Sequence, residues 1–89
     1  MPKLLITHTV ADVDTWLRYK AERAEAVEGL GGTNVMDHVA HEGSAMVAVS
    51  ADVADAEAVI ATLASPPLEL ASVMERHGVL PPLVAYVEG

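Results

Sequence analysis

The stretch ASPPLELASVMERHGVLPP, residues 64–82, contains the start and stop signals of one helix. Ser65 is suited to cap a helix whose first turn accepts Pro66, because the first helical N–H has no partner within the helix. Gly78 can adopt the left-handed conformation that ends a helix, and Pro81-Pro82 prevents the helix from resuming. The stretch therefore predicts a helix over 66–77, and the apolar run 83–87 after it predicts a strand.

The preceding residues alternate between strand and helix patterns. Residues 4–10 are rich in β-branched side chains and place His8 on the same face as Leu4 and Ile6. Asp12 can cap a helix over 13–28, and glycines follow that helix. Residues 33–41 and 45–50 are predicted to form two strands of a hairpin, and Asp52 and Asp55 open a helix that runs through Ala64. One buried stripe is predicted on the first helix, where Lys20 can lay only its stem. The stripe consists of Val13, Trp16, Leu17, Lys20, Ala24 and Val27.

This order of elements, βαββα(α)β, predicts an α+β fold. A four-stranded antiparallel sheet with helices on one face buries the apolar side of every element. The handedness rule for crossovers places the first and third strands side by side in the middle, as in the ferredoxin-like arrangement. Residues 1–89 are enough for one domain of this kind.

The composition predicts that the chain pairs with a second copy of itself. Hydrophobic residues make up 52% of the sequence, with no phenylalanine and a mean hydropathy of +0.32. The helix-free face of the predicted sheet carries Leu, Val, Met and Ala, which a monomer would expose as a large apolar patch. We therefore expect a homodimer in which two sheets pack face to face around a two-fold axis, forming a dimeric α/β barrel.

The charge excludes several classes of partner. The net charge is −8, with a pI of about 4.6 and five basic residues, so we expect no binding to nucleic acid or to an acidic membrane surface. No signal peptide or membrane-spanning run is recognisable, and we expect a cytoplasmic protein. Three of the basic residues lie in Arg18–Arg23, which is typical of a solvated helix face and alternatively of a small anion-attracting rim.

Most sequence motifs for chemistry are missing. There is no cysteine, no Gly-x-Ser-x-Gly and no glycine-rich loop after a strand, so thiolate, serine hydrolase, kinase and nucleotide-binding functions are not expected. Asp37-His38 and His41-Glu42 contain metal-ligand residue types, but residues 38 and 41 point to opposite faces of a strand. We therefore expect no metal site.

Histidines and one tryptophan remain as candidates for a site. His8, in the middle of a strand among apolar neighbours, can act as a general base or bind an acidic ligand, or it can be a hydrogen-bonded core histidine. Trp16 fits a core anchor better than a stacking platform. His77 falls in the last turn of its predicted helix, where an imidazole acts most simply as a cap.

Two local patterns together resemble a known group of proteins. They are Val10-Ala11-Asp12-Val13-Asp14-Thr15-Trp16, and Ala64-Ser65-Pro66-Pro67-Leu68 with Met74-Glu75-Arg76-His77-Gly78-Val79 and Pro81-Pro82. The sequence resembles small members of the dimeric α/β-barrel superfamily, which includes antibiotic-biosynthesis-monooxygenase-like and stress-responsive barrel proteins. The resemblance spans nearly the whole chain and its motifs are mainly structural. It implies the ferredoxin-like fold and does not select among oxygenase, haem-degrading, isomerase, cyclase and non-enzymatic relatives.

The resemblance also implies a pocket between the sheet and the helices. Monooxygenase-like and haem-degrading relatives place an Asn, a Trp and sometimes a His around it. In this chain the single Trp lies in the first predicted helix and the single Asn at the start of the second strand, so these residues do not match directly. The residues predicted for the pocket are a base, a positioning histidine, an amide and two aromatic walls: His8, His38, Asn34, Trp16 and Tyr86.

Two functions of different classes remain. The first is a monooxygenase-, cyclase- or isomerase-like enzyme that acts without a tightly bound cofactor on a small apolar or aromatic substrate, with His8 and His38 as catalytic residues. The second is a non-catalytic dimeric module that binds a small ligand or supports assembly. The scarcity of polar side chains that converge on one site favours the second function.

Overall fold

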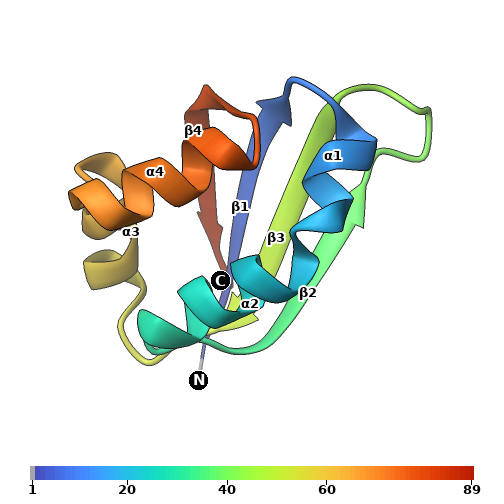
Figure 1. Cartoon of the computed structure of the whole chain (residues 1–89). Coiled ribbons are helices and arrows are strands. Elements are labelled where there is room, and N and C mark those ends of the chain that lie inside the picture. Colours follow the sequence, from blue (N-terminus) through green and yellow to red (C-terminus); the bar gives the residue numbers. More distant parts are fainter. Residues whose placement is uncertain (1) are drawn as a thin grey trace.

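The computed structural model describes residues 2–89 and forms one sheet covered on one face by helices (Figure 1). The elements follow in the order β1 (Lys3–Val10), α1 (Val13–Arg18), α2 (Lys20–Gly29), β2 (Thr33–Val39), β3 (Met46–Asp52), α3 (Ala56–Ala64), α4 (Leu68–Arg76) and β4 (Val79–Val87). The four strands are antiparallel in the order β2-β3-β1-β4, with β1 and β3 in the middle. The predicted α+β ferredoxin-like fold is confirmed.

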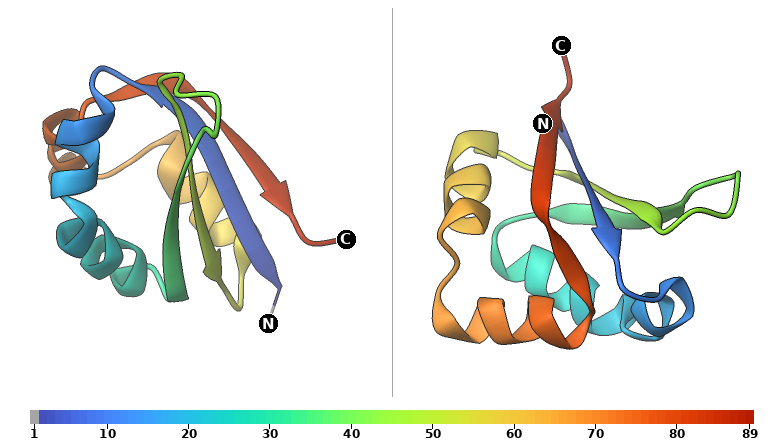
Figure 2. Two further views of the ribbon diagram at one scale, coloured as in Figure 1. Left: turned by 90° about the vertical axis from the view of Figure 1, so that its right-hand side faces the viewer. Right: turned by 90° about the horizontal axis from the view of Figure 1, so that it is seen from above.

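The strand register assigns each residue to one face of the sheet. On β1 the buried residues alternate, and across the central ladder Ile6 pairs with Val49 and His8 with Val47, all on the helix-covered face. Leu5, which pairs with Ser50 and Tyr86, lies on the opposite face. Figure 2 shows that the helices lie on one side of the sheet and leave this second face uncovered.

The core lies between the sheet and the helices in two clusters. One is built around Leu4, Ile6, Ala51, Val53 and Val59, and the other around Val10, Trp16, Val47 and Val49. None of the helices formed by residues 2–89 combines the length and the apolar character that spanning a bilayer requires.

The first predicted helix is divided in two at Tyr19. Asp12 caps α1 through its carboxylate, as predicted, but α1 ends at Arg18 and α2 begins at Lys20. The Tyr19 ring stacks on His77, which belongs to a segment more than fifty residues away in sequence. A tertiary contact of this kind overrides local helix propensity and is not visible in the helical pattern. The predicted buried stripe is also wrong in part, because Leu17 is exposed.

The boundaries around the prolines differ from the prediction as well. Ser65 is the C-terminal cap of α3 and does not cap the next helix, since a residue before proline avoids helical geometry, and α4 begins at Leu68. Gly78 adopts the predicted left-handed conformation, with a φ of 75°. β4 starts at Val79, earlier than predicted, and runs through Pro81-Pro82. Proline is tolerated there because β4 is an edge strand.

Candidate functional site

An apolar cavity lies between the helix-covered face of the sheet and helices α2 and α4. It measures about 90 Å³ and opens to the surface. Most of its wall is aliphatic, including Leu70, Val73 and Met74 of α4. The residues with polar side-chain atoms in this wall are His8, Trp16, Arg23 and His77.

His8 is held by β1 with its ring against the core. Its side chain is buried, and its Nδ1 lies 3.1 Å from the carbonyl oxygen of Thr9. Because a carbonyl can only accept a hydrogen bond, Nδ1 carries the proton in this contact and Nε2 keeps a lone pair. Nε2 makes no hydrogen bond to any residue of the described chain, 2–89. His8 is therefore a residue of the cavity wall that keeps one hydrogen-bond acceptor unused within residues 2–89.

Burial sets the protonation state of His8. It lowers the pKa of His8 below its ordinary value of 6.5, and the Thr9 carbonyl, which favours the charged ring, only partly opposes this effect. The nearby Arg23 charge lowers the pKa further. At neutral pH the ring is therefore neutral, which is the state that a general base requires.

Trp16 is fully buried on α1 between two other members of the site. Its ring meets the edge of His8 at an interplanar angle of 78°, with 6.2 Å between ring centroids. The guanidinium carbon of Arg23 lies 3.8 Å from the centroid of the Trp16 ring, a cation–π contact. The indole N–H is buried without a hydrogen-bond partner among residues 2–89. Trp16 thus fixes the positions of His8 and Arg23.

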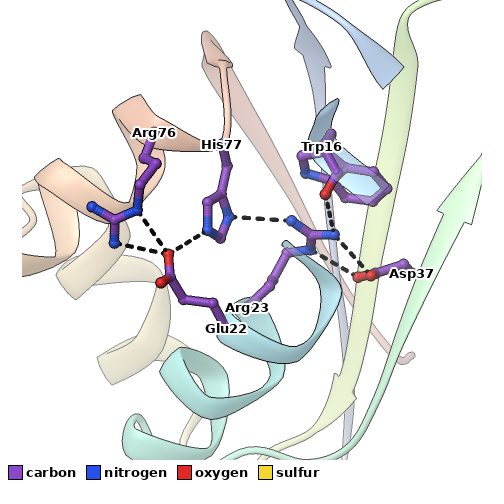
Figure 3. Close-up of polar contacts among 6 residues, drawn as sticks. All are labelled: Trp16, Glu22, Arg23, Asp37, Arg76 and His77. Atoms are coloured by element: carbon purple, nitrogen blue, oxygen red, sulfur yellow. Dashed lines mark hydrogen bonds and ion pairs between the residues drawn. The ribbon is translucent and has the colours of Figure 1, made fainter. Parts of the chain in front are cut away.

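Arg23 is a buried cation whose hydrogen bonds go to three other residues (Figure 3). Its Nε and Nη2 donate to the two carboxylate oxygens of Asp37 at 3.0 and 2.9 Å, and Nη2 also donates to the backbone oxygen of Trp16. Arg23 is 7% exposed, and its two parallel hydrogen bonds to Asp37 are the strong, bidentate form of an Arg–carboxylate pair. Its Nη1 reaches Nδ1 of His77 at 3.2 Å.

The tautomer of His77 follows from these contacts. A guanidinium only donates, so Nδ1 of His77 accepts from Arg23, and the proton is on Nε2. Nε2 donates to Oε1 of Glu22 at 2.8 Å, and Arg76 donates to the same oxygen (Figure 3). His77 is therefore neutral in a chain of hydrogen bonds that connects α2, the end of α4 and, through Asp37, β2.

Burial is also the main cause that lowers the pKa of His77. The hydrogen bond to Glu22 opposes this shift, whereas the charges of Arg23 and Arg76 add to it. The pKa of Glu22 is lowered by its hydrogen bonds from His77 and Arg76. We name this set of residues the polar relay: Glu22, Arg23, Asp37, Arg76 and His77.

The structure brings together two of the five predicted site residues, His8 and Trp16. His38 lies on the helix-free face, where its Nε2 is 2.9 Å from Oγ of Ser50. Tyr86 is exposed on the same face. Asn34 is exposed, with a φ of 56° at an irregularity in β2, and its side chain donates to Asp52. The expectation that His38, Asn34 and Tyr86 line the same pocket as His8 is therefore wrong, because the sheet lies between them.

Sequence reasoning missed Arg23, Asp37 and His77. Arg23 was assigned to a solvated helix face or an anion-attracting rim, and His77 to a simple cap; His77 is indeed the residue after α4, but both side chains are buried. One signal in the sequence could have found them. If Val35 and Val39 face the core, the strand period places Asp37 there too, and a buried carboxylate requires a cationic partner.

Acidic and imidazole side chains do not gather into a metal site. Within residues 2–89 no group of three or more His, Cys, Asp or Glu side chains could hold a metal ion. Asp37, one of the residues considered for such a site, has both carboxylate oxygens bonded to Arg23.

Comparisons with known proteins support the fold. No family model and no curated protein matches the sequence. Among solved structures, an antibiotic biosynthesis monooxygenase is similar to the whole chain over 97% of its own length, with a TM-score of 0.65 and 11% identity. Candidate antibiotic biosynthesis monooxygenases from Deinococcus radiodurans and Nitrosomonas europaea are similar to the whole chain over 93% and 97% of their lengths, with TM-scores of 0.58 and 0.59 and identities of 15% and 10%.

These similarities confirm, at the level of the fold, the resemblance that the sequence predicted. The chain has the ferredoxin-like fold of antibiotic-biosynthesis-monooxygenase-like proteins.

Proposed function

We propose that the chain is a small enzyme that acts, without a tightly bound cofactor, on a small apolar or aromatic substrate in the cavity beside His8. The observation that carries this proposal is that His8, whose Nε2 makes no hydrogen bond within residues 2–89, lines a cavity with a mostly aliphatic wall. Of the other polar side chains in this wall, Arg23 and His77 bond to Asp37, Glu22 and each other, and the buried Trp16 indole N–H is a donor without a partner among residues 2–89. Similarity to structures named as antibiotic biosynthesis monooxygenases agrees with this class of enzyme.

The proposed chemistry begins with a proton transfer. His8 Nε2 accepts a proton from an O–H or an acidic C–H of the substrate, and the Thr9 carbonyl then stabilises the imidazolium through Nδ1–H. In an isomerase or cyclase the imidazolium returns that proton to another atom. In a cofactor-independent monooxygenase the substrate itself reduces oxygen, so that R₂CH₂ and O₂ give R₂C=O and H₂O.

The test measures proton removal directly. Wild-type protein is incubated in D₂O with 2-indanone, a small apolar C–H acid, and NMR follows the exchange of its CH₂ protons while an electrode records oxygen uptake. The His8→Gln variant should lose about a hundredfold or more of the protein-dependent exchange rate. The His41→Gln variant, altered in an exposed turn, should retain the rate. Equal rates in wild type and His8→Gln would refute His8 as the base.

A second function is a binding module without catalysis. It is favoured by the pairing of Arg23 and His77 with other protein groups, which leaves one free acceptor and no second catalytic group at the cavity wall. In this case phenol binds in a His8-dependent manner while 2-indanone exchange stays at the rate of buffer alone.

A second copy of the chain is the proposed partner, and it would cover the helix-free face. The residues that share this face include five large exposed apolar side chains: Met36, Met46, Leu80, Val84 and Tyr86. They come from all the strands other than β1, so they form a broad surface and not an isolated patch. Packing this surface against the same surface of a second chain would remove it from water, which supports a two-fold homodimer.

A further inference from the structure

A second apolar cavity lies beside the first, between the C-terminal half of α3 and β4. It measures about 210 Å³ and includes Ile60 and Ala64 of α3 and Ala85 of β4 in its wall. Every residue that lines it has an aliphatic side chain or is proline. Its side chains therefore offer no group that could recognise a charge or a hydrogen bond, and they suit hydrocarbon, while backbone atoms supply the polar part of the lining.

The two cavities share part of their walls. Ile6, Leu63 and Leu83 line both, so the cavities are separated by no more than these aliphatic side chains. A third cavity of about 40 Å³ is also lined by Ile6 and Leu63. Ile6 and Leu63 therefore border all three cavities, so further incompletely filled space adjoins the cavity at His8.

The sizes differ in a way that matters for a ligand. An apolar cavity of about 150 Å³ is filled by benzene in a well-known engineered protein. The cavity at His8, about 90 Å³, is smaller than this, whereas its neighbour is larger. A ligand that places a hydrogen-bonding head at His8 therefore has room to extend toward the α3–β4 side, and not within the first cavity.

We propose that the cavity between α3 and β4 is a tail subsite, which binds the hydrocarbon chain of a ligand whose hydroxylated head contacts His8. The substrate class is then a single-headed amphiphile: one small ring or enol with one O–H donor, carrying an alkyl tail. This inference rests on the proposed function, because His8 defines where the head binds. The tail subsite sets specificity for chain length through Ala64 and Ala85, whose small side chains leave the space open.

The experiment uses phenol, 4-ethylphenol and 4-butylphenol as probes and measures Kd by NMR titration of the whole chain. Burial of each added methylene should lower Kd about fourfold in the wild type. Ala64→Leu fills the subsite from an exposed helical position and should abolish this gain while leaving the Kd for phenol unchanged. Ala61→Leu, on the same helix but outside the cavities, should keep the gain.

The outcomes separate this inference from the proposed function. Equal Kd values across the three phenols, or a chain-length gain that survives in both Ala64→Leu and Ala85→Leu, would overturn the tail subsite. Failure of all three phenols to bind, or binding that His8→Gln leaves unchanged, would overturn the proposed function and the subsite together. Circular dichroism checks that each variant is folded. If Ala64→Leu does not fold, Ala85→Leu replaces it as the variant that fills the subsite.

Discussion

The two faces of the sheet hold the candidate histidines in opposite settings. On the helix-covered face, His8 borders a cavity and keeps one nitrogen free, and the buried charges of Arg23 and Asp37 neutralise each other. On the helix-free face, His38 is bonded to Ser50 beside exposed apolar side chains. The face of the strand on which a histidine lies thus sets its surroundings: His8 lines a cavity, whereas His38 lies on a face with exposed apolar side chains.

Among the substitutions that test the difference between the two faces, Asp37→Ala should have the largest effect on stability. Its carboxylate is 4% exposed and is the sole anionic partner of Arg23 in the relay, so its removal leaves a buried, unpaired cation. We expect the free energy of unfolding to fall by about 3–5 kcal/mol, as measured by urea denaturation. Lys3→Ala, which removes an exposed ion pair with Asp52, should change stability little. A similar effect of the two substitutions would contradict the account of the buried pair.

The next largest effect is expected on the Kd of the proposed dimer, from a substitution on the helix-free face. Met36 and Val39 are both 51% exposed, and they lie on opposite faces of β2. In the proposed dimer, Met36→Glu places like charges in a shared apolar interface, at a cost of about 3 kcal/mol, or roughly a hundredfold in dimer Kd. Val39→Glu should leave the dimer intact. Sedimentation velocity at several concentrations checks both, and a monomeric wild type at micromolar concentration would refute the dimer.

A smaller effect is expected from acid. The pKa of His8 and that of His77 are both lowered by folding, so the folded protein binds fewer protons than the unfolded chain just below the ordinary value of 6.5. The contribution of these two histidines to the free energy of unfolding is therefore fully present above pH 6.5. It is lost as the pH drops toward their lowered pKa values. His77→Gln keeps an acceptor for Arg23 and a donor for Glu22, and it should flatten this decline. Urea midpoints between pH 7.5 and 5 measure it. An unchanged decline would show that folding does not lower the pKa of His77.

The fold could be predicted because its signals are local. The strand period placed His8 with Leu4 and Ile6, Asp12 and Asp55 cap helices as their positions indicated, and Gly78 takes the conformation that ends a helix. The candidate site could be predicted only in part, because the relay joins residues that are 14 and 54 positions apart in sequence. A helical pattern does not distinguish a buried arginine from a solvated one, and the stacking of Tyr19 on His77 joins residues that are far apart in sequence.

The proposed function requires that His8 present an unprotonated Nε2 to the cavity. Long-range ¹H–¹⁵N NMR of the imidazole at pH 7 tests it most directly, before and after addition of phenol. We predict a proton on Nδ1, an unprotonated Nε2, and a change in the Nε2 shift when phenol donates to it. A ring protonated at Nε2, or an Nε2 signal that phenol leaves unmoved while binding elsewhere, would contradict the account.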